Sequence, residues 1–176
     1  MSPKFFTAAS KLGTIQRMID TSKVSNRREL RFNSIDDALA EIDRIAAAER
    51  AGKLRCVGNW SVGQVFNHLG TWAEFAYKPN PLKSPLPIRL ILRLMKKRFI
   101  KGPMKVGARI PGVTDGTLGA ESCSLDDGYS RVQSAFRRLK DEAPTQPNVI
   151  FGPLSHEEWI QMNLRHAELH LSFLHC

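Results

Sequence analysis

The sequence predicts an all-α fold, most simply a four-helix bundle, and three features of its 176 residues indicate it. Apolar residues recur every three or four positions in four segments, which is the period that buries one face of a helix. Each segment begins with an N-cap pattern, a serine followed three residues later by Asp, Glu or Gln. The alternation of apolar and polar residues that marks a strand is confined to residues 54–57. Four long amphipathic segments favour helices packed on one another over a helix-and-sheet fold.

The limits of the four predicted helices follow from residues that start or stop a helix. The N-cap serine and its partner three residues later are, in chain order, Ser34 and Asp37, Ser61 and Gln64, Ser124 and Asp127, and Ser155 and Glu158. Glycine favours the left-handed conformation that ends a helix, and proline lacks the N–H that would continue it. The expected ends are, in the same order, Gly52, about Tyr77, Pro144 and a position close to Cys176.

Between the second and third helices, residues 87–101 also have helical periodicity, and a connection rich in glycine and proline follows at 102–119. A helical wheel separates a basic face from an apolar face. The basic face holds Arg89, Arg93, Lys96 and Lys97, and the apolar face holds Ile88, Ile91, Leu92, Met95 and Phe99. Two interpretations stand. One is an insert packed on the bundle or used in dimerisation, with a solvated charged face. The other is a helix that contacts anionic lipid or nucleic acid.

The positive charge of the protein is concentrated in this same region. The net charge is +9, from 26 Lys and Arg against 17 Asp and Glu. Residues 83–109 contain nine basic residues and no acidic one, so the remaining 17 basic residues balance the 17 acidic ones. A hydrophobic content of 42% excludes a disordered chain. No uncharged apolar run is long enough to span a membrane.

The N-terminal residues and the cysteines bear on location. Residues 1–33 are polar and without sustained periodicity, so we expect a partly ordered arm there. The apolar run at residues 5–10 is too short for the core of a signal peptide. Cys56, Cys123 and Cys176 form an odd set with no close spacing, which predicts free thiols rather than disulfides or a metal knuckle. We therefore expect a cytoplasmic protein.

Two histidines stand out on the last predicted helix. On a wheel of about 100° per residue, His166 and His170 fall at the centre of an apolar stripe, where leucine is the usual residue. The other members of the stripe are Trp159, Met162, Leu169 and Phe173, and the opposite side holds Gln161, Arg165, Glu168 and Ser172. Histidines spaced i, i+4 direct two nitrogens at one point, as in zinc-binding helices. The alternative is that each is a core histidine hydrogen-bonded to its neighbours.

The other three histidines differ in where the pattern puts them. His68 lies at the edge of the apolar face of the second helix, a position suited to lining a cleft but not forced inside. His156 falls in the first turn of the last helix, where a capping or surface role is expected. His175 is expected to face solvent or belong to the tail.

Four stretches of the chain together resemble a known family. They are Arg27-Arg28-Glu29-Leu30-Arg31-Phe32, Asn59-Trp60-Ser61-Val62-Gly63-Gln64-Val65-Phe66-Asn67-His68-Leu69, Phe151-Gly152-Pro153-Leu154-Ser155 and Arg165-His166-Ala167-Glu168-Leu169-His170-Leu171-Ser172-Phe173-Leu174. In order and spacing they resemble the DinB/YfiT superfamily, most closely a bacterial branch of uncharacterised domains. The resemblance covers about residues 27–174, so we expect an N-terminal arm at 1–26 and a single DinB-like domain at 27–176.

The resemblance implies a fold and a site. The DinB-like fold is a four-helix bundle, to which this chain adds an amphipathic basic helix between the second and third bundle helices. The family holds a divalent metal, commonly nickel or zinc, with one histidine on the second helix and a pair on the last. The ligands implied here are His68, His166 and His170, with a position left open to water. Characterised relatives include transferases and isomerases that act on low-molecular-weight thiols.

Other residues are candidates for the surroundings of this site, each with a plainer alternative. Gln64 is a candidate second-shell or substrate contact, or only the capping partner of Ser61. Asn163 is a candidate pocket residue, or only a polar residue at the helix edge. Trp72 and Trp159 are candidate pocket walls, or only core residues. Carboxylates are absent from the metal-facing sides, so we assign no catalytic group beyond metal-bound water.

The sequence therefore supports two hypotheses of function. The first is a metal-dependent transferase or hydrolase that acts on a low-molecular-weight thiol or on another small molecule. The second is a non-catalytic binding module, in which residues 83–109 contact anionic lipid, nucleic acid or a protein partner, a second copy included. The sequence has no Gly-rich phosphate loop and no GxSxG turn, which excludes the enzyme classes that depend on them.

Overall fold

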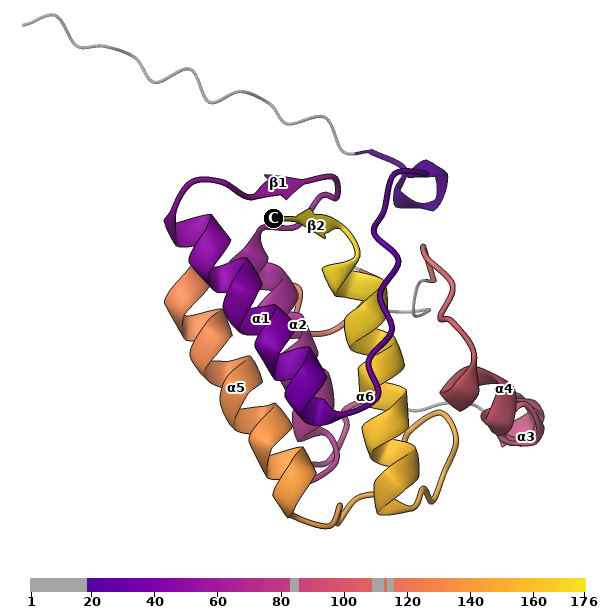
Figure 1. Cartoon of the computed structure of the whole chain (residues 1–176). Helices are drawn as coiled ribbons and strands as arrows, with labels where there is room; N and C mark the ends of the chain where they lie inside the picture. Colours follow the sequence, from indigo (N-terminus) through magenta and orange to yellow (C-terminus); the bar gives the residue numbers. More distant parts are fainter. Residues whose placement is uncertain (1–18, 83–85, 109–112, 114–115) are drawn as a thin grey trace, which may run out of the picture.

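The computed structural model describes residues 19–82, 86–108, 113 and 116–176, and over these the protein is mainly helical (Figure 1). The helices are η1 (Thr21–Lys23), α1 (Ile35–Arg50), α2 (Val62–Glu74), α3 (Leu86–Leu94), α4 (Lys96–Lys101), α5 (Leu125–Asp141) and α6 (His156–Leu171). The two short strands are β1 (Arg55–Cys56) and β2 (Leu174–His175), which pair antiparallel. The mainly helical class predicted from the sequence is confirmed.

All four predicted N-caps are present. The side-chain oxygens of Ser34, Ser61, Ser124 and Ser155 each accept a hydrogen bond from the backbone N–H three residues later. The reciprocal bond that completes a capping box is present in α1, α2 and α6. These starts follow from local sequence alone, because the bonds that make them join residues only three positions apart.

The predicted end of the last helix is wrong. The α6 helix ends at Leu171 rather than near Cys176, and the chain then forms β2. Cys56 lies opposite Leu174 in the ladder, and the backbone N–H of Val57 donates to the Phe173 carbonyl. The backbone N–H and C=O groups of residues 54–57 need hydrogen-bond partners, and β2 supplies them. A continued α6 would leave these groups without those partners. His175 consequently lies in a strand and is half-buried.

The core lies between α1, α2, α5 and α6. Each contributes fully buried apolar side chains, among them Ile42, Phe66, Phe136 and Leu164. The closest approach of backbones is between α2 and the N-terminal part of α5. A Cβ added at Gly63 would overlap the carbonyl oxygen of Cys123, and one added at Gly128 would overlap the carbonyl oxygen of Gly63. Glycine at both positions is what allows these helices to approach so closely.

The chain segment that precedes α1 runs along α6, as Figure 1 shows. The backbone N–H of Arg28 donates to the Ser172 carbonyl, and the Arg27 side chain donates to the Ser172 hydroxyl. Arg165 and Glu168 bind the backbone carbonyl and N–H of Phe32, respectively. The side that the wheel set opposite the apolar stripe is therefore largely buried, because the wheel has no information on segments outside the helix. The described residues before α1 are thus attached to the domain from Arg27 onward, and also at Ile19, whose backbone N–H and C=O both bond to the Asn59 side chain. Residues 1–18 lie outside the described residues.

The predicted basic helix is divided at Met95 into α3 and α4. The second piece is attached to α6 and the loop before it: Phe99 packs on Phe151 with ring centroids 5.7 Å apart, and Lys96 pairs with Glu158 at 2.6 Å. Lys96 thus leaves the predicted basic face, and Ile91 and Met95 of the predicted apolar face are exposed. The predicted side-chain positions of Ile88 and Arg89 lie outside the described residues. Among the described helices, none has the length and hydropathy to cross a membrane.

Candidate metal centre

Three histidines from two helices meet at one point. His68 comes from the middle of α2, and His166 and His170 come from successive turns of α6. The ligand nitrogens of these histidines all lie within 4.8 Å of one another, and the Nε2 atoms of His68 and His166 are 3.1 Å apart. The three residues that the resemblance implied as ligands are therefore brought together by the packing of α2 on α6.

The exposure of these histidines differs from the prediction. His68, expected at an edge, is 1% exposed, whereas His166 and His170 are half-buried. The reason is the segment before α5, which runs along α2 so that the Leu118 carbonyl lies 2.7 Å from His68 Nδ1. This contact joins residues 50 positions apart, which helical periodicity cannot reveal.

All three imidazoles are held in the neutral form at pH 7. Burial lowers the pKa of His68 from 6.5 to about 4, although the Leu118 carbonyl and the charge of Glu121 act in the opposite direction. Burial also lowers the pKa values of His166 and His170 well below the ordinary range, and the neighbouring imidazoles lower them further. A neutral imidazole has one nitrogen lone pair, which is the form that a metal ion binds.

The Leu118 carbonyl also selects the tautomer of His68. In the neutral ring, Nδ1–H donates to this carbonyl, so the lone pair is on Nε2, the nitrogen that faces His166. A backbone carbonyl that accepts from the far nitrogen is one of the usual ways in which proteins orient a histidine toward a metal. The Trp72 indole N–H donates to the same carbonyl at 3.2 Å.

Two tryptophans border the histidines. Trp72, predicted as a pocket wall, has its ring centroid 5.8 Å from that of His166 and in an edge-on arrangement. Trp60 stacks on His170 at 5.3 Å with an interplanar angle of 7°, and it meets His68 edge-on at 4.9 Å. Sequence reasoning did not select Trp60. Its position directly before the N-cap Ser61, where a residue packs back toward the helix, is the signal that was available.

The remaining candidates are placed elsewhere. Gln64 completes the capping box of α2 and also donates to the Ala120 carbonyl at 3.0 Å. Asn163 is buried, and its side-chain nitrogen donates to the Trp159 carbonyl of its own helix. Trp159 is 1% exposed and belongs to the core. His156 contacts the Leu139 carbonyl at 2.6 Å, which joins the start of α6 to α5.

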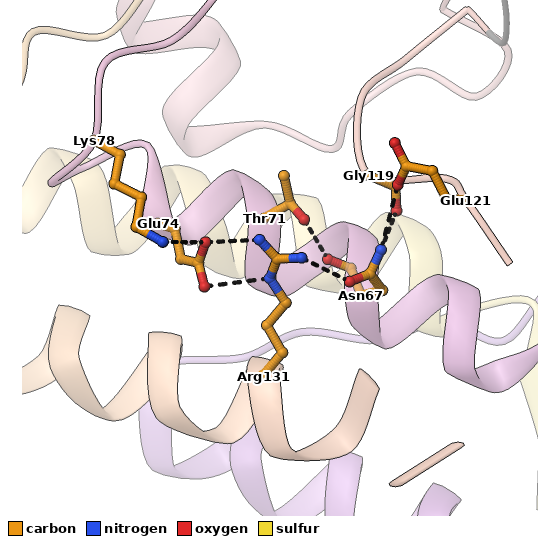
Figure 2. A network of polar contacts seen from close by, with 7 residues as sticks. All are labelled: Asn67, Thr71, Glu74, Lys78, Gly119, Glu121 and Arg131. Atoms are coloured by element: carbon orange, nitrogen blue, oxygen red, sulfur yellow. Dashed lines mark hydrogen bonds and ion pairs between the residues drawn. The ribbon is translucent and has the colours of Figure 1, made fainter. Parts of the chain in front are cut away.

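Successive side chains of α2 bind successive carbonyls of the segment at residues 118–120. Gln64, Asn67 and His68 take the carbonyls of Ala120, Gly119 and Leu118, so the segment runs opposite to the helix. Figure 2 shows how Asn67 is fixed in turn: its side-chain oxygen accepts from Arg131 at 2.9 Å. The structure therefore holds the carbonyl that orients His68 by more than one bond.

The Arg131 guanidinium links this contact to a charged group. It donates from Nε and Nη2 to the two carboxylate oxygens of Glu74, at 3.2 and 2.8 Å, and Lys78 donates to the same carboxylate (Figure 2). Burial raises the pKa of Glu74, but the hydrogen bonds from Arg131 and Lys78 outweigh it and lower the pKa. Glu74 is therefore ionised at neutral pH and holds Arg131 against Asn67. This network was not predicted, because it joins α2, α5 and a loop.

Comparison with known proteins gives one family and no closer relative. Residues 24–176 match the model of the family described as "Protein of unknown function (DUF1569)". No curated protein and no solved structure matches the chain.

Proposed function

The chain belongs to the DUF1569 family, and we propose that it binds one divalent metal ion, zinc or nickel, through His68, His166 and His170. The observation that carries this proposal is the convergence of three neutral imidazoles within 4.8 Å. As part of the same proposal, the helices α1, α2, α5 and α6 form a four-helix bundle of the DinB/YfiT type. The shared core of these four helices supports it.

The spacing of the histidine nitrogens fits a zinc or nickel ion. In a tetrahedral site with bonds of about 2.1 Å, ligand nitrogens lie about 3.4 Å apart. The Nε2 atoms of His68 and His166 are 3.1 Å apart, slightly less than this value. All the ligand nitrogens lie within 4.8 Å of one another, so the value falls inside the observed range. Imidazole nitrogen is a good ligand for zinc and for nickel and does not choose between them.

Three protein ligands leave a coordination position for a small molecule. Neutral ligands leave the ion its full charge of about +2, which favours an ionised water or a thiolate beside it. We propose a transferase or hydrolase activity on a small molecule, with a low-molecular-weight thiol as the first substrate to test.

The cysteines support a cytoplasmic location as part of this proposal. Free thiols are typical of a reducing compartment, and Cys56, Cys123 and Cys176 are all free.

Metal content is the direct test. The purified protein is expected to carry close to one zinc or nickel ion per chain by elemental analysis, and the triple variant H68A/H166A/H170A to carry none. The ion should also raise the melting temperature, since a ligand at about 1,000 times its Kd stabilises by about 4 kcal/mol. His156→Ala is the matched control, because this histidine is also in α6 but bonds to Leu139. Failure to bind either ion when supplied, or equal binding by the triple variant, would sink the proposal.

A second prediction tests the orientation of His68 by the segment at 118–120. Gly119 has φ +75°, and a Cβ there would lie 2.8 Å from Thr71 of α2. Gly119→Ala is therefore expected to push the Leu118 carbonyl away from His68 and to weaken metal binding about 10–100-fold. Gly52→Ala is the control, because Gly52 has φ +64° with no atom within 4 Å of such a Cβ. It adds the same backbone strain without the clash. Equal metal affinity of both variants in a competition titration would contradict the role given to Leu118.

A further inference from the structure

The exposed large apolar side chains of the described residues are gathered in one place. Four of the five are Leu90, Ile91, Leu94 and Met95, at 64%, 58%, 82% and 41% exposure, and we name them the α3 patch. The fifth is Ile19. Exposed apolar residues scattered singly are normal in proteins, but a contiguous group marks a surface that contacts something apolar.

The α3 patch is on the outer side of a helix that is anchored from its other side. Leu90, Ile91 and Leu94 fall within about 100° of one another on the wheel of α3. Leu92 falls roughly opposite and packs against the hydrophobic core. In α4, Phe99 also packs against the core and Ile100 is buried. The exposure of the patch thus follows from how α3 and α4 are attached, and Figure 1 shows both helices at the side of α6.

Basic residues lie next to the α3 patch along the chain. Residues 83–109 contain nine basic residues and no acidic one. Those that the structure shows exposed are Arg93, Lys97, Arg98, Lys101 and Lys105. An apolar face bordered by lysine and arginine is the pattern of helices that lie in the interface of an anionic membrane.

We propose that the α3 patch docks the protein on an anionic lipid surface, with Leu90, Ile91 and Leu94 in the acyl boundary and the basic side chains at the headgroups. Nucleic acid fits less well, because phosphate contacts use the basic residues but leave the leucines in water. A second copy fits less well too. A two-fold contact would bring residues 83–109 of two copies together, and since this segment has basic but no acidic residues, the two copies would repel each other. The proposal does not depend on the metal site.

Vesicle sedimentation tests the proposal with the full chain. The protein is expected to sediment at low ionic strength with vesicles of phosphatidylcholine and phosphatidylserine, and to remain in solution with phosphatidylcholine alone. Leu90→Ser with Leu94→Ser removes apolar contact, and Arg93→Glu with Lys97→Glu reverses charge. Each pair is expected to weaken partitioning about tenfold or more, because each basic residue at the headgroups and each leucine in the acyl boundary contributes to binding.

Matched controls separate the α3 patch from general effects. Ile19→Ser removes the exposed large apolar side chain that lies outside the α3 patch among the described residues, and Lys53→Glu with Arg55→Glu reverses charge at exposed positions elsewhere. Both controls should sediment much more than the α3 variants, and circular dichroism should show equal helicity in all. No sedimentation of the wild type overturns the proposal, as does sedimentation that the leucine variant retains in full. If the wild type does not bind vesicles, two further measurements identify the other occupant. A dimer that Leu94→Ser disperses would assign the α3 patch to a second copy, and DNA binding that the leucine variant keeps would assign the basic residues to nucleic acid.

Discussion

Glu168→Leu is expected to destabilise the protein by about 3–5 kcal/mol, because it leaves the Arg165 guanidinium as an unbalanced charge inside the protein. The Arg165 side chain is 1% exposed and that of Glu168 is 9% exposed, and their charged atoms are 2.9 Å apart. Arg165 Nε and Nη1 have no hydrogen-bond partner among the described residues. The carboxylate also accepts from the Phe32 N–H at 2.6 Å, so its loss leaves a second buried donor unpaired.

The double variant gives this prediction its sharpest test. Arg165→Met with Glu168→Leu removes both charges, and we expect it to recover most of the loss, since well-packed apolar residues often replace a buried ion pair at little cost. Urea unfolding of the wild type, both single variants and the double variant measures the coupling. Glu157→Leu, at an exposed position of α6, is the control and should change stability by no more than about 0.5 kcal/mol. A Glu168→Leu protein with the wild-type midpoint would contradict the burial of the pair.

Alanine at either glycine of the α2–α5 contact is the second substitution with a large expected effect. Gly63→Ala would place a Cβ 2.6 Å from the Ser124 carbonyl oxygen and still closer to that of Cys123. Backbone atoms cannot rotate away as side chains do, so the helices must separate, at a cost of about 3 kcal/mol or more. Gly128→Ala meets the Gly63 backbone from the other side and should cost a similar amount.

Helix propensity alone predicts the opposite change in stability, so whether stability falls or rises tests the backbone contact. In the interior of a helix with open space, glycine to alanine stabilises by about 1 kcal/mol. Ser134→Ala, on the exposed face of α5, is the control and should be neutral or slightly stabilising. Thermal unfolding of Gly63→Ala and Gly128→Ala should show a clear loss of stability in both. A gain in either would mean that the two backbones are not in contact there.

The starts of the helices were predictable because they depend on short-range chemistry. The N-cap bonds of Ser34, Ser61, Ser124 and Ser155 join residues three positions apart, and all four were predicted from the sequence. The pairing of His166 with His170 was predictable for the same reason, since a helix sets residues four apart on one face. The end of α6 was not, because it depends on strand pairing with Cys56, far away in the chain.

The surroundings of the histidines show the limit of periodicity more clearly. A wheel locates His68 relative to the apolar face of its own helix, and by that measure it is at the edge. Its burial comes from Leu118, which approaches from a segment 50 residues away. Arg165 and Glu168 show the same limit from the other side of α6, since Phe32 covers them. In each case the covering segment is outside the helix whose pattern was read.

The sequence by itself determined the helical class, the four helix starts and the two histidines that share a face of the last helix. That His68 joins them was implied only by the resemblance to a family. The tertiary structure decided that His68 is buried, that the Leu118 carbonyl selects its tautomer, and that Leu90, Ile91 and Leu94 of α3 face outward. The physical reason is the range of the forces involved. Backbone hydrogen bonds and helical spacing act within a few residues, whereas burial and the partners of a polar group depend on which distant segments the packed chain brings near.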